Sequence, residues 1–283
     1  MSNCNQLAHE IGLSFYDKKL NQALRTIYEC GVKLEAKLET ISSAAIYFHR
    51  FFSVSSPELF DPVLIGATCI YLAGKVEEDH IHLRDLINVF HSTLNRAHKM
   101  IPLKFDNYYW NLRESLVQLE LLLLRVLKFD VNNQLAHQYL VHYLRSLTEW
   151  IGKDYTTTIS LAQTCWSLLN DYYMDPKCIN YSGQQIAIAV IQIALETHSI
   201  QIPYEKESLV GWKLALYEQG TLEKTNQIIS DILTLYENDD KEYSTRALTS
   251  MENSSNVAKS NSEDLLAAFR KYTPSKIIEY TPK

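Results

Sequence analysis

Histidines and carboxylates are the residues best able to do chemistry in this chain of 283 residues, which contains nine histidines. His80 and His82 are separated by one residue, and His137 and His142 lie 5 positions apart. Neither pair has the H-E-x-x-H or H-x-x-x-H spacing that places two ligands on one helical face, and no carboxylate completes a metal set. Glycine-rich phosphate loops and the G-x-S-x-G nucleophile motif are also missing from the sequence. We therefore predict no catalytic residues, no metal site and no cofactor, and we expect the chain itself not to be an enzyme.

Two charged residues stand out because of their apolar surroundings. Lys75 closes an apolar run that begins after Asp61, and a cation at the C-terminal end of a helix interacts favourably with the helix dipole. Glu120 is flanked by leucine and valine on a helix that is apolar over most of its circumference. A carboxylate there is costly unless it has a partner or lies on a surface that another protein covers. The residues leave two interpretations open, a solvated strip near Arg113 and Arg125 or a docking surface.

The elements that position these residues are expected to be helices. The chain has only 8 glycines and 7 prolines, about 5% of its residues, whereas an average protein has roughly 12%. Turns depend on these two residue types, so few turns per residue are expected. A hydrophobic content of 46% with 21% charged residues is sufficient for packed cores. We predict an all-α fold of long helices with short connections, and we exclude sheet-rich folds.

The helical pattern occurs twice along the chain. Each half contains a nearly all-apolar helix, at 61–78 and at 181–198, which we expect to be buried among the others. The two halves correspond at an offset of roughly 117–120 positions, by pattern and not by identity. Gly66 and Gly74 in the first apolar helix are expected to let neighbouring helices approach closely. The pattern predicts two tandem five-helix repeats, each around a buried central helix.

Composition also sets the expected domain boundaries. Residues 239–262 are mainly Asp, Glu, Lys, Ser, Thr and Asn, which is typical of a flexible tail. We predict an N-terminal segment at 1–16, a first repeat at 17–133, a second repeat at 134–238 and a mostly disordered tail at 239–283.

Charge and cysteine usage indicate the setting. A net charge of −6 argues against direct DNA binding, since binding to phosphates depends on excess Lys and Arg. The five cysteines contain no C-x-x-C pair, so we expect buried thiols in a reducing compartment. No secretory signal or membrane-spanning stretch is recognisable, and we expect a soluble protein of the nucleus or cytoplasm that does not bind membranes.

Three spaced segments of the first half point to a family. They are YFHRFF at 47–52, YLAGKVEE at 71–78 and LELLLLRVLKFDV at 119–131. Together they resemble the cyclin box, particularly that of transcription-type cyclins, and the two five-helix repeats match the tandem cyclin fold. The resemblance is strong in the first repeat and mainly one of pattern in the second.

Within the cyclins, the sequence is most similar to the cyclin Q subtype, also called cyclin M. This similarity is carried by GVKL at 31–34, DLINV at 85–89 and YWNLRESLVQLELLLLRVLKFDV at 109–131. It implies a heterodimer with a kinase that resembles the tenth-numbered cyclin-dependent kinase, acting in transcription or in the cell cycle.

The cyclin resemblance also implies a mechanism and a set of site residues. In cyclins, a Lys and a Glu at the positions of Lys75 and Glu120 bond to kinase backbone beside the regulatory C-helix of the kinase. A cyclin that binds only the active position of that helix activates the kinase by shifting its conformational population. The residues so implied are Lys75, Glu120, Val76, Glu78, Leu124, Phe129 and Val131.

The sequence departs from many cell-cycle cyclins in its first repeat, and its tail adds a modification motif. The M-R-A-I-L-x-x-W patch that recruits substrates in such cyclins corresponds to 24–30 here, without the tryptophan, so this route of recruitment is not expected. Thr273 and Thr281 each precede a proline, with a lysine shortly after. We interpret both as candidate phosphorylation sites for the bound kinase, although such short motifs also occur by chance.

An alternative function comes from another class of proteins with tandem cyclin-like repeats. Transcription-factor adaptors use such repeats to bind promoter complexes. That use needs a basic face, and the charge of −6 does not supply one. The sequence therefore favours a kinase-binding cyclin.

Overall fold

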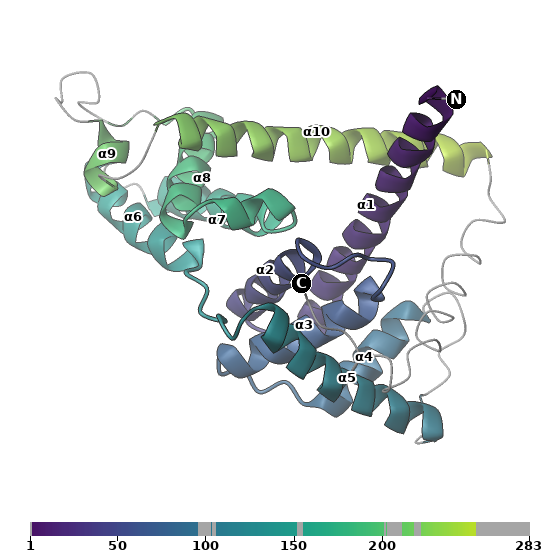
Figure 1. Ribbon diagram of the computed structural model, residues 1–283. Coiled ribbons are helices and arrows are strands. Elements are labelled where there is room, and N and C mark those ends of the chain that lie inside the picture. The colour runs from purple at the N-terminus through teal and green to yellow at the C-terminus, as the bar shows by residue number, and fades with distance from the viewer. Residues whose placement is uncertain are drawn as a thin grey trace. The chain divides into compact units, whose positions relative to one another are not determined.

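The computed structural model describes residues 2–95, 106–151, 155–200, 211–217 and 222–252, together with Leu103 and Ile202. Every regular element within these residues is a helix, which confirms the predicted all-α fold. The helices divide into two compact units, the first of which ends at Asn133 and the second of which begins at Gln134. Figure 1 shows the helices of the two units.

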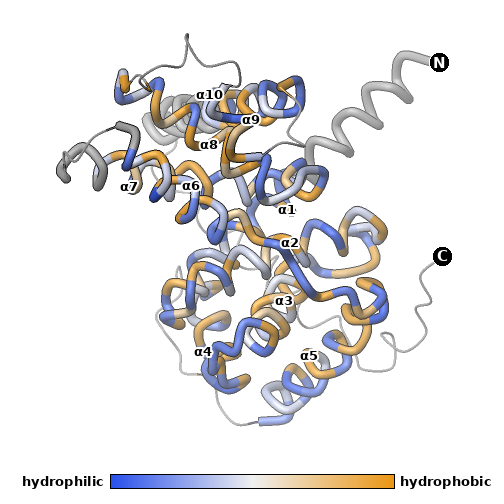
Figure 2. The backbone as a smooth tube through the Cα atoms, turned by 90° about the vertical axis from the view of Figure 1, so that its left-hand side faces the viewer, coloured by the Kyte–Doolittle hydropathy of each residue, from blue (hydrophilic) through white to orange (hydrophobic). Residues whose placement is uncertain are grey.

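The described residues of the first unit form five helices, and α3 lies at their centre (Figure 1). The helix α3 packs against each of the other four helices of the unit. Blue and orange alternate along α4 and α5 in Figure 2, as expected for helices with one buried and one exposed face. The helices are α1 (Ser2–Lys33), α2 (Leu38–Phe52), α3 (Pro62–Val76), α4 (Leu83–Leu94) and α5 (Asn107–Val126).

The sequence around α3 explains why this helix forms at the centre. The Asp61 carboxylate accepts a hydrogen bond from the Val63 N–H at 3.2 Å, and a proline occupies the first helical turn. Twelve of the 15 residues of α3 are buried. A side chain at Gly66 would come within 2.9 Å of Ile27, so α1 approaches α3 closely there, as expected. Gly74 instead faces the connection to α4, because its nearest neighbours are in Asp79 and Ile81.

The second unit repeats this plan around α8. Eleven of the 15 residues of α8 are buried, and α8 packs against α6, α7 and α10. Together with the first unit, this confirms the predicted pair of five-helix repeats. The elements are α6 (Ala136–Ile151), α7 (Tyr155–Tyr172), the short 3-10 helix η1 (Pro176–Asn180), α8 (Gly183–Thr197), α9 (Trp212–Leu216) and α10 (Leu222–Glu252).

The start of α8 is fixed by a capping box and by a glycine. The Ser182 hydroxyl accepts from the Gln185 N–H at 3.4 Å, and the Gln185 side chain accepts from the Ser182 N–H at 3.4 Å. A Cβ atom at Gly183 would collide with the backbone carbonyl of Gln134. The chain before α6 therefore lies directly against the first turn of α8, and only glycine leaves room for it.

Both ends of the helical array extend beyond the expected boundaries. The helix α1 begins at Ser2, where we expected a separate segment over 1–16. The helix α10 continues to Glu252, where we expected the tail to begin at 239. The low hydrophobicity of residues 239–252 indicates that they have little apolar surface to bury, and we had therefore expected a flexible tail. These residues contain no proline or glycine to end a helix, so α10 continues through them. Residues 253–283, including Thr273 and Thr281, lie outside the described residues.

Four of the five cysteines are buried with free thiols, as expected: Cys30, Cys69, Cys165 and Cys178. Burial raises the pKa of Cys30 to about 11 and that of Cys165 to about 12. These thiols therefore stay protonated at neutral pH. Among the described residues, no helix combines the length and hydropathy that crossing a bilayer requires.

Candidate functional site

Lys75 and Glu120 form an ion pair at the junction of α3 and α5. The Lys75 Nζ atom lies 2.6 Å from Glu120 Oε1 and 4.2 Å from the centre of the Tyr71 ring. The Lys75 side chain is 50% exposed, whereas the Glu120 side chain is 13% exposed. Glu120 is therefore not part of a solvated strip, and Lys75 is the partner that compensates its burial. The pair presents an accessible ammonium group that is anchored by a covered carboxylate.

An apolar stripe lies along the exposed face of α5 beside this pair. Trp110, Val117 and Leu121 are 55%, 45% and 47% exposed, and Leu124 is half-buried. Their spacing of 7, 4 and 3 residues places them on one face of the helix. The resemblance implied Leu124 alone. The other three could have been found from the sequence, because they share a helical face that the leucines at 112, 116, 119 and 123 do not use.

A turn with an unusual backbone follows α5. Lys128 and Phe129 have φ angles of 55° and 59°, the left-handed region that residues with a bulky side chain rarely adopt. The Phe129 N–H donates to the Leu124 carbonyl at 2.8 Å, and the Phe129 side chain is 63% exposed. Val131 is half-buried, and its carbonyl accepts from the Tyr47 hydroxyl at 2.6 Å. The turn thus places an aromatic ring in solvent at the end of the apolar stripe.

The C-terminal end of α3 is held by side chains of α2 and the residue before it. The Ser43 hydroxyl donates to Glu77 at 2.6 Å. The Asp79 carboxylate accepts from the Lys37 N–H at 2.8 Å and from the Thr40 hydroxyl at 2.9 Å. Asp79 thereby caps α2, because the side chain of the N-cap residue Lys37 makes no capping bond of its own. This network fixes the segment that carries Lys75, Val76 and Glu78.

The seven residues named from the sequence therefore lie in two adjacent places of the first unit. Val76 is half-buried at the end of α3, and Glu78 is exposed with a φ angle of 51°. Glu120 and Leu124 lie on α5, against which α3 packs, and Phe129 and Val131 lie in the turn that follows.

The histidines considered as ligands lie apart from this site. His80 and His82 are exposed near the start of α4. In the second unit, His137 is buried, stacks on Tyr173 at 5.6 Å between ring centres and lies 3.2 Å from the Asn170 side-chain oxygen. His142 is exposed. Across the residues the structure describes, no group of three or more metal-ligating side chains occurs.

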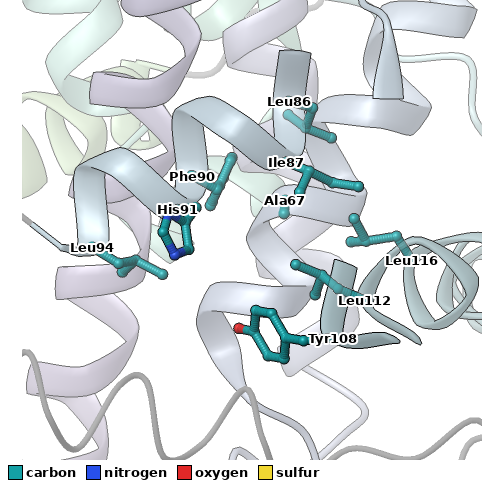
Figure 3. Close-up of a pocket in the computed structure, with 9 residues that line it drawn as sticks. All are labelled: Ala67, Leu86, Ile87, Phe90, His91, Leu94, Tyr108, Leu112 and Leu116. Atoms are coloured by element: carbon teal, nitrogen blue, oxygen red, sulfur yellow. The ribbon is translucent and has the colours of Figure 1, made fainter. Parts of the chain in front are cut away.

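A small apolar pocket lies between α3, α4 and α5 (Figure 3). It has room for about one water molecule. Burial lowers the pKa of His91, which lies 2.9 Å from the Asn95 side-chain nitrogen. We interpret the pocket as a packing gap. Its lining residues are Ala67, Leu86, Ile87, Phe90, His91, Leu94, Tyr108, Leu112 and Leu116.

Comparison with known proteins identifies the first unit. The family model "Cyclin, N-terminal domain" matches residues 12–132. These residues belong to the cyclin family. Cyclin-K of Danio rerio is 29% identical over 217 residues, which cover 76% of this chain and 49% of Cyclin-K. Cyclin-L2 of Rattus norvegicus is 29% identical over 238 residues, 83% of this chain and 42% of Cyclin-L2. The transcription-type cyclin box is confirmed, and the cyclin Q subtype stays a prediction.

Solved structures share the same cyclin fold. A chain of the yeast RNA Pol II CTD kinase CTDK-1 complex has a TM-score of 0.64 at 19% identity, and the match covers 79% of this chain and 67% of that chain. A chain of the CAK complex of Chaetomium thermophilum has a TM-score of 0.59 at 14% identity, with 94% of this chain and 75% of that chain covered. The present chain spans about half the length of the curated cyclins it matches, or somewhat less.

Proposed function

We propose that this cyclin is a non-enzymatic regulatory subunit that binds and activates a cyclin-dependent serine/threonine kinase. Its structural neighbours include a chain of the yeast RNA Pol II CTD kinase CTDK-1 complex and a chain of the yeast TFIIK complex. These names support a nuclear role in transcription. Its similarity to cyclin Q favours a kinase of the tenth-numbered cyclin-dependent type as the partner.

The observation that carries this proposal is the exposed Lys75 ammonium group, held by Glu120 beside an apolar stripe. A lysine ammonium group has three donors, and Glu120 accepts from one of them at 2.6 Å. No second hydrogen-bond acceptor for this group lies within the described part of the chain, so the remaining donors can meet backbone carbonyls of a partner helix end. Val117, Leu121 and Phe129 supply apolar area beside them. This combination of a polar anchor and exposed apolar side chains is typical of an interface centre.

Docking at this surface would activate the kinase through differential affinity. Phosphoryl transfer requires the Lys–Glu ion pair of the kinase, and this pair forms only when its C-helix lies in the active position. A rigid surface that fits only this position raises its population by the ratio of the two affinities. The bonds from Ser43, Lys37 and Thr40 to Glu77 and Asp79 supply rigidity at the end of α3.

A charge-exchange series on the full chain tests the anchor. We expect Lys75→Glu and Glu120→Lys each to abolish co-purification and activation of the kinase. The double variant restores an intramolecular ion pair and therefore the melting temperature, but it exchanges the donor and the acceptor that face the kinase. Kinase binding should consequently stay lost. Circular dichroism and a kinase assay measure the two outcomes.

A matched control comes from the surface ion pair between Lys33 and Glu29 on α1, at 2.8 Å. Exchanging these two charges should leave kinase binding unchanged. Full activation by both single variants at Lys75 and Glu120 would contradict the anchor. Failure of the wild-type chain to bind any cyclin-dependent kinase would contradict the proposed function as a whole.

A further inference from the structure

The turn after α5 has a conformation that its own residues do not favour. Among the described residues, Lys128 and Phe129 are the only two adjacent non-glycine residues with positive φ, at 55° and 59°. The left-handed conformation is energetically unfavourable for residues that carry a side chain. Such a conformation persists when the surrounding structure determines it. Contacts from outside the turn must therefore hold it.

Two side chains of α2 hold the turn by three hydrogen bonds. Arg50 Nη1 donates to the Asp130 carbonyl at 2.8 Å, and Arg50 Nη2 donates to the Asp130 carboxylate at 2.9 Å. One helical turn earlier, the Tyr47 hydroxyl donates to the Val131 carbonyl at 2.6 Å. Tyr47 is fully buried, and burial raises its pKa well above the ordinary range, so the hydroxyl keeps its proton. The bonds therefore fix two consecutive residues directly after Phe129.

The geometry of the Arg50 contact requires a guanidinium group. Its two nitrogens reach a backbone and a side-chain oxygen of the same residue, which a planar fork can do and a single ammonium group cannot. The Asp130 side chain is 68% exposed, so the pair itself contributes little to stability. Its effect is on the direction of the chain, since Phe129 immediately precedes Asp130.

We propose that Arg50 is a positioning residue of the kinase-docking surface. By bonding to Asp130, it holds Lys128 and Phe129 in the left-handed conformation that presents the Phe129 ring at the end of the α5 stripe. This inference rests on the proposed function, because the partner that contacts Phe129 is the kinase. Arg50 itself contacts the turn and acts through Phe129.

The first experiment uses the free full-length chain and needs no kinase. Trypsin cleaves after Lys128 only when the turn opens, and Lys128 is already exposed. We expect Arg50→Gln to accelerate this cleavage by about tenfold, with Arg50→Lys in between, since a lysine retains one of the bonds. Arg145→Gln, at an exposed position on α6, is the control and should leave the rate unchanged. Equal cleavage rates in Arg50→Gln and the wild type would overturn the inference.

The second experiment is a double-mutant cycle with Phe129→Ala, read out as kinase affinity. In the wild-type background, we expect Arg50→Gln to weaken kinase binding by about tenfold. In the Phe129→Ala background, we expect the same substitution to weaken kinase binding by less than about twofold. A merely structural role of Arg50 would weaken binding equally in both backgrounds, and that outcome would overturn the inference. If the wild-type chain binds no kinase, the proposed function fails and this role fails with it. If trypsin cleaves Arg50→Gln rapidly but this variant binds the kinase as tightly as the wild type does, the positioning role of Arg50 is overturned and the proposed function is not.

Discussion

At the scale of single residues, Asp61 shows how one side chain can start a helix and still weaken the fold. Its carboxylate caps α3, but its Oδ2 atom has no hydrogen-bond partner within the described part of the chain. Burial raises the pKa of the carboxyl from 3.8 to about 6, although the Val63 N–H bond and the charge of Lys19 act in the opposite direction. The folded protein therefore binds this proton more tightly than the unfolded chain does.

This linkage predicts a pH-dependent effect of Asp61→Asn. As the pH rises from about 4 to about 6, the wild-type free energy of unfolding falls by about 1–3 kcal/mol because the folded state must ionise a buried group. Asparagine caps a helix equally well but does not ionise. The variant should unfold at a higher temperature than the wild type at pH 7, and the difference should vanish near pH 4. Thermal unfolding followed by circular dichroism measures both.

Asp106→Asn is the matched control for this prediction. Asp106 also caps a helix, with its carboxylate accepting from the Tyr109 N–H at 3.2 Å, but it is exposed. Its substitution should therefore give no stabilisation that grows with pH. A stabilisation by Asp61→Asn of the same size at pH 4 and pH 7 would contradict the argument from burial.

At the scale of elements, α5 has two apolar faces with different roles. One face packs against α3, and the other carries Trp110, Val117 and Leu121 into solvent. An apolar face that the fold does not use needs another explanation, and several such residues in one stripe indicate an interaction surface. Sequence periodicity separates the two apolar faces of α5, but it does not say which of them the rest of the unit covers.

The exposed face of α5 gives a prediction at this scale. Leu121 is 47% exposed, so Leu121→Ser should change the free energy of unfolding by less than about 0.5 kcal/mol. The same substitution should weaken kinase binding by at least about tenfold, because it places a polar group at the centre of the docking surface. Isothermal titration calorimetry against the kinase and thermal unfolding measure the two effects.

Val141→Ser is the control, since Val141 is a 54% exposed residue of α6 in the second unit. It should change neither stability nor kinase binding. Equal kinase affinities of Leu121→Ser and the wild type would exclude the α5 stripe from the interface.

At the scale of the whole molecule, the net charge separates the two uses of tandem cyclin repeats. With a charge of −6, the chain should show no saturable change in fluorescence anisotropy with a duplex of about 20 base pairs at about 150 mM salt. The protein should be titrated up to a concentration of about 10 µM, because a basic DNA-binding protein already binds duplexes non-specifically at that concentration. Saturable binding that weakens as salt is added would instead favour the promoter-adaptor function.

The sequence was most informative about the central helices. Asp61 and Ser182 precede apolar runs with few glycines and prolines, and these local features alone predict the start and the burial of α3 and α8. The outer ends of α1 and α10 were predicted less well. Residues with little apolar surface to bury can still have enough helix propensity to extend a helix. The extension of α10 to Glu252 is the clearest example.

The sequence likewise predicted part of the candidate site, and the rest became visible only in the tertiary structure. The sequence by itself determined the all-helical repeats and the cyclin family of the first unit, because composition, caps and motifs are local properties. Only the tertiary structure decided that Glu120 pairs with Lys75, that Asp79 caps α2 and that Arg50 bonds to Asp130 in the turn that carries Phe129. These contacts join residues 39 to 80 positions apart. No local pattern specifies such pairs, since their geometry exists only after the helices have packed.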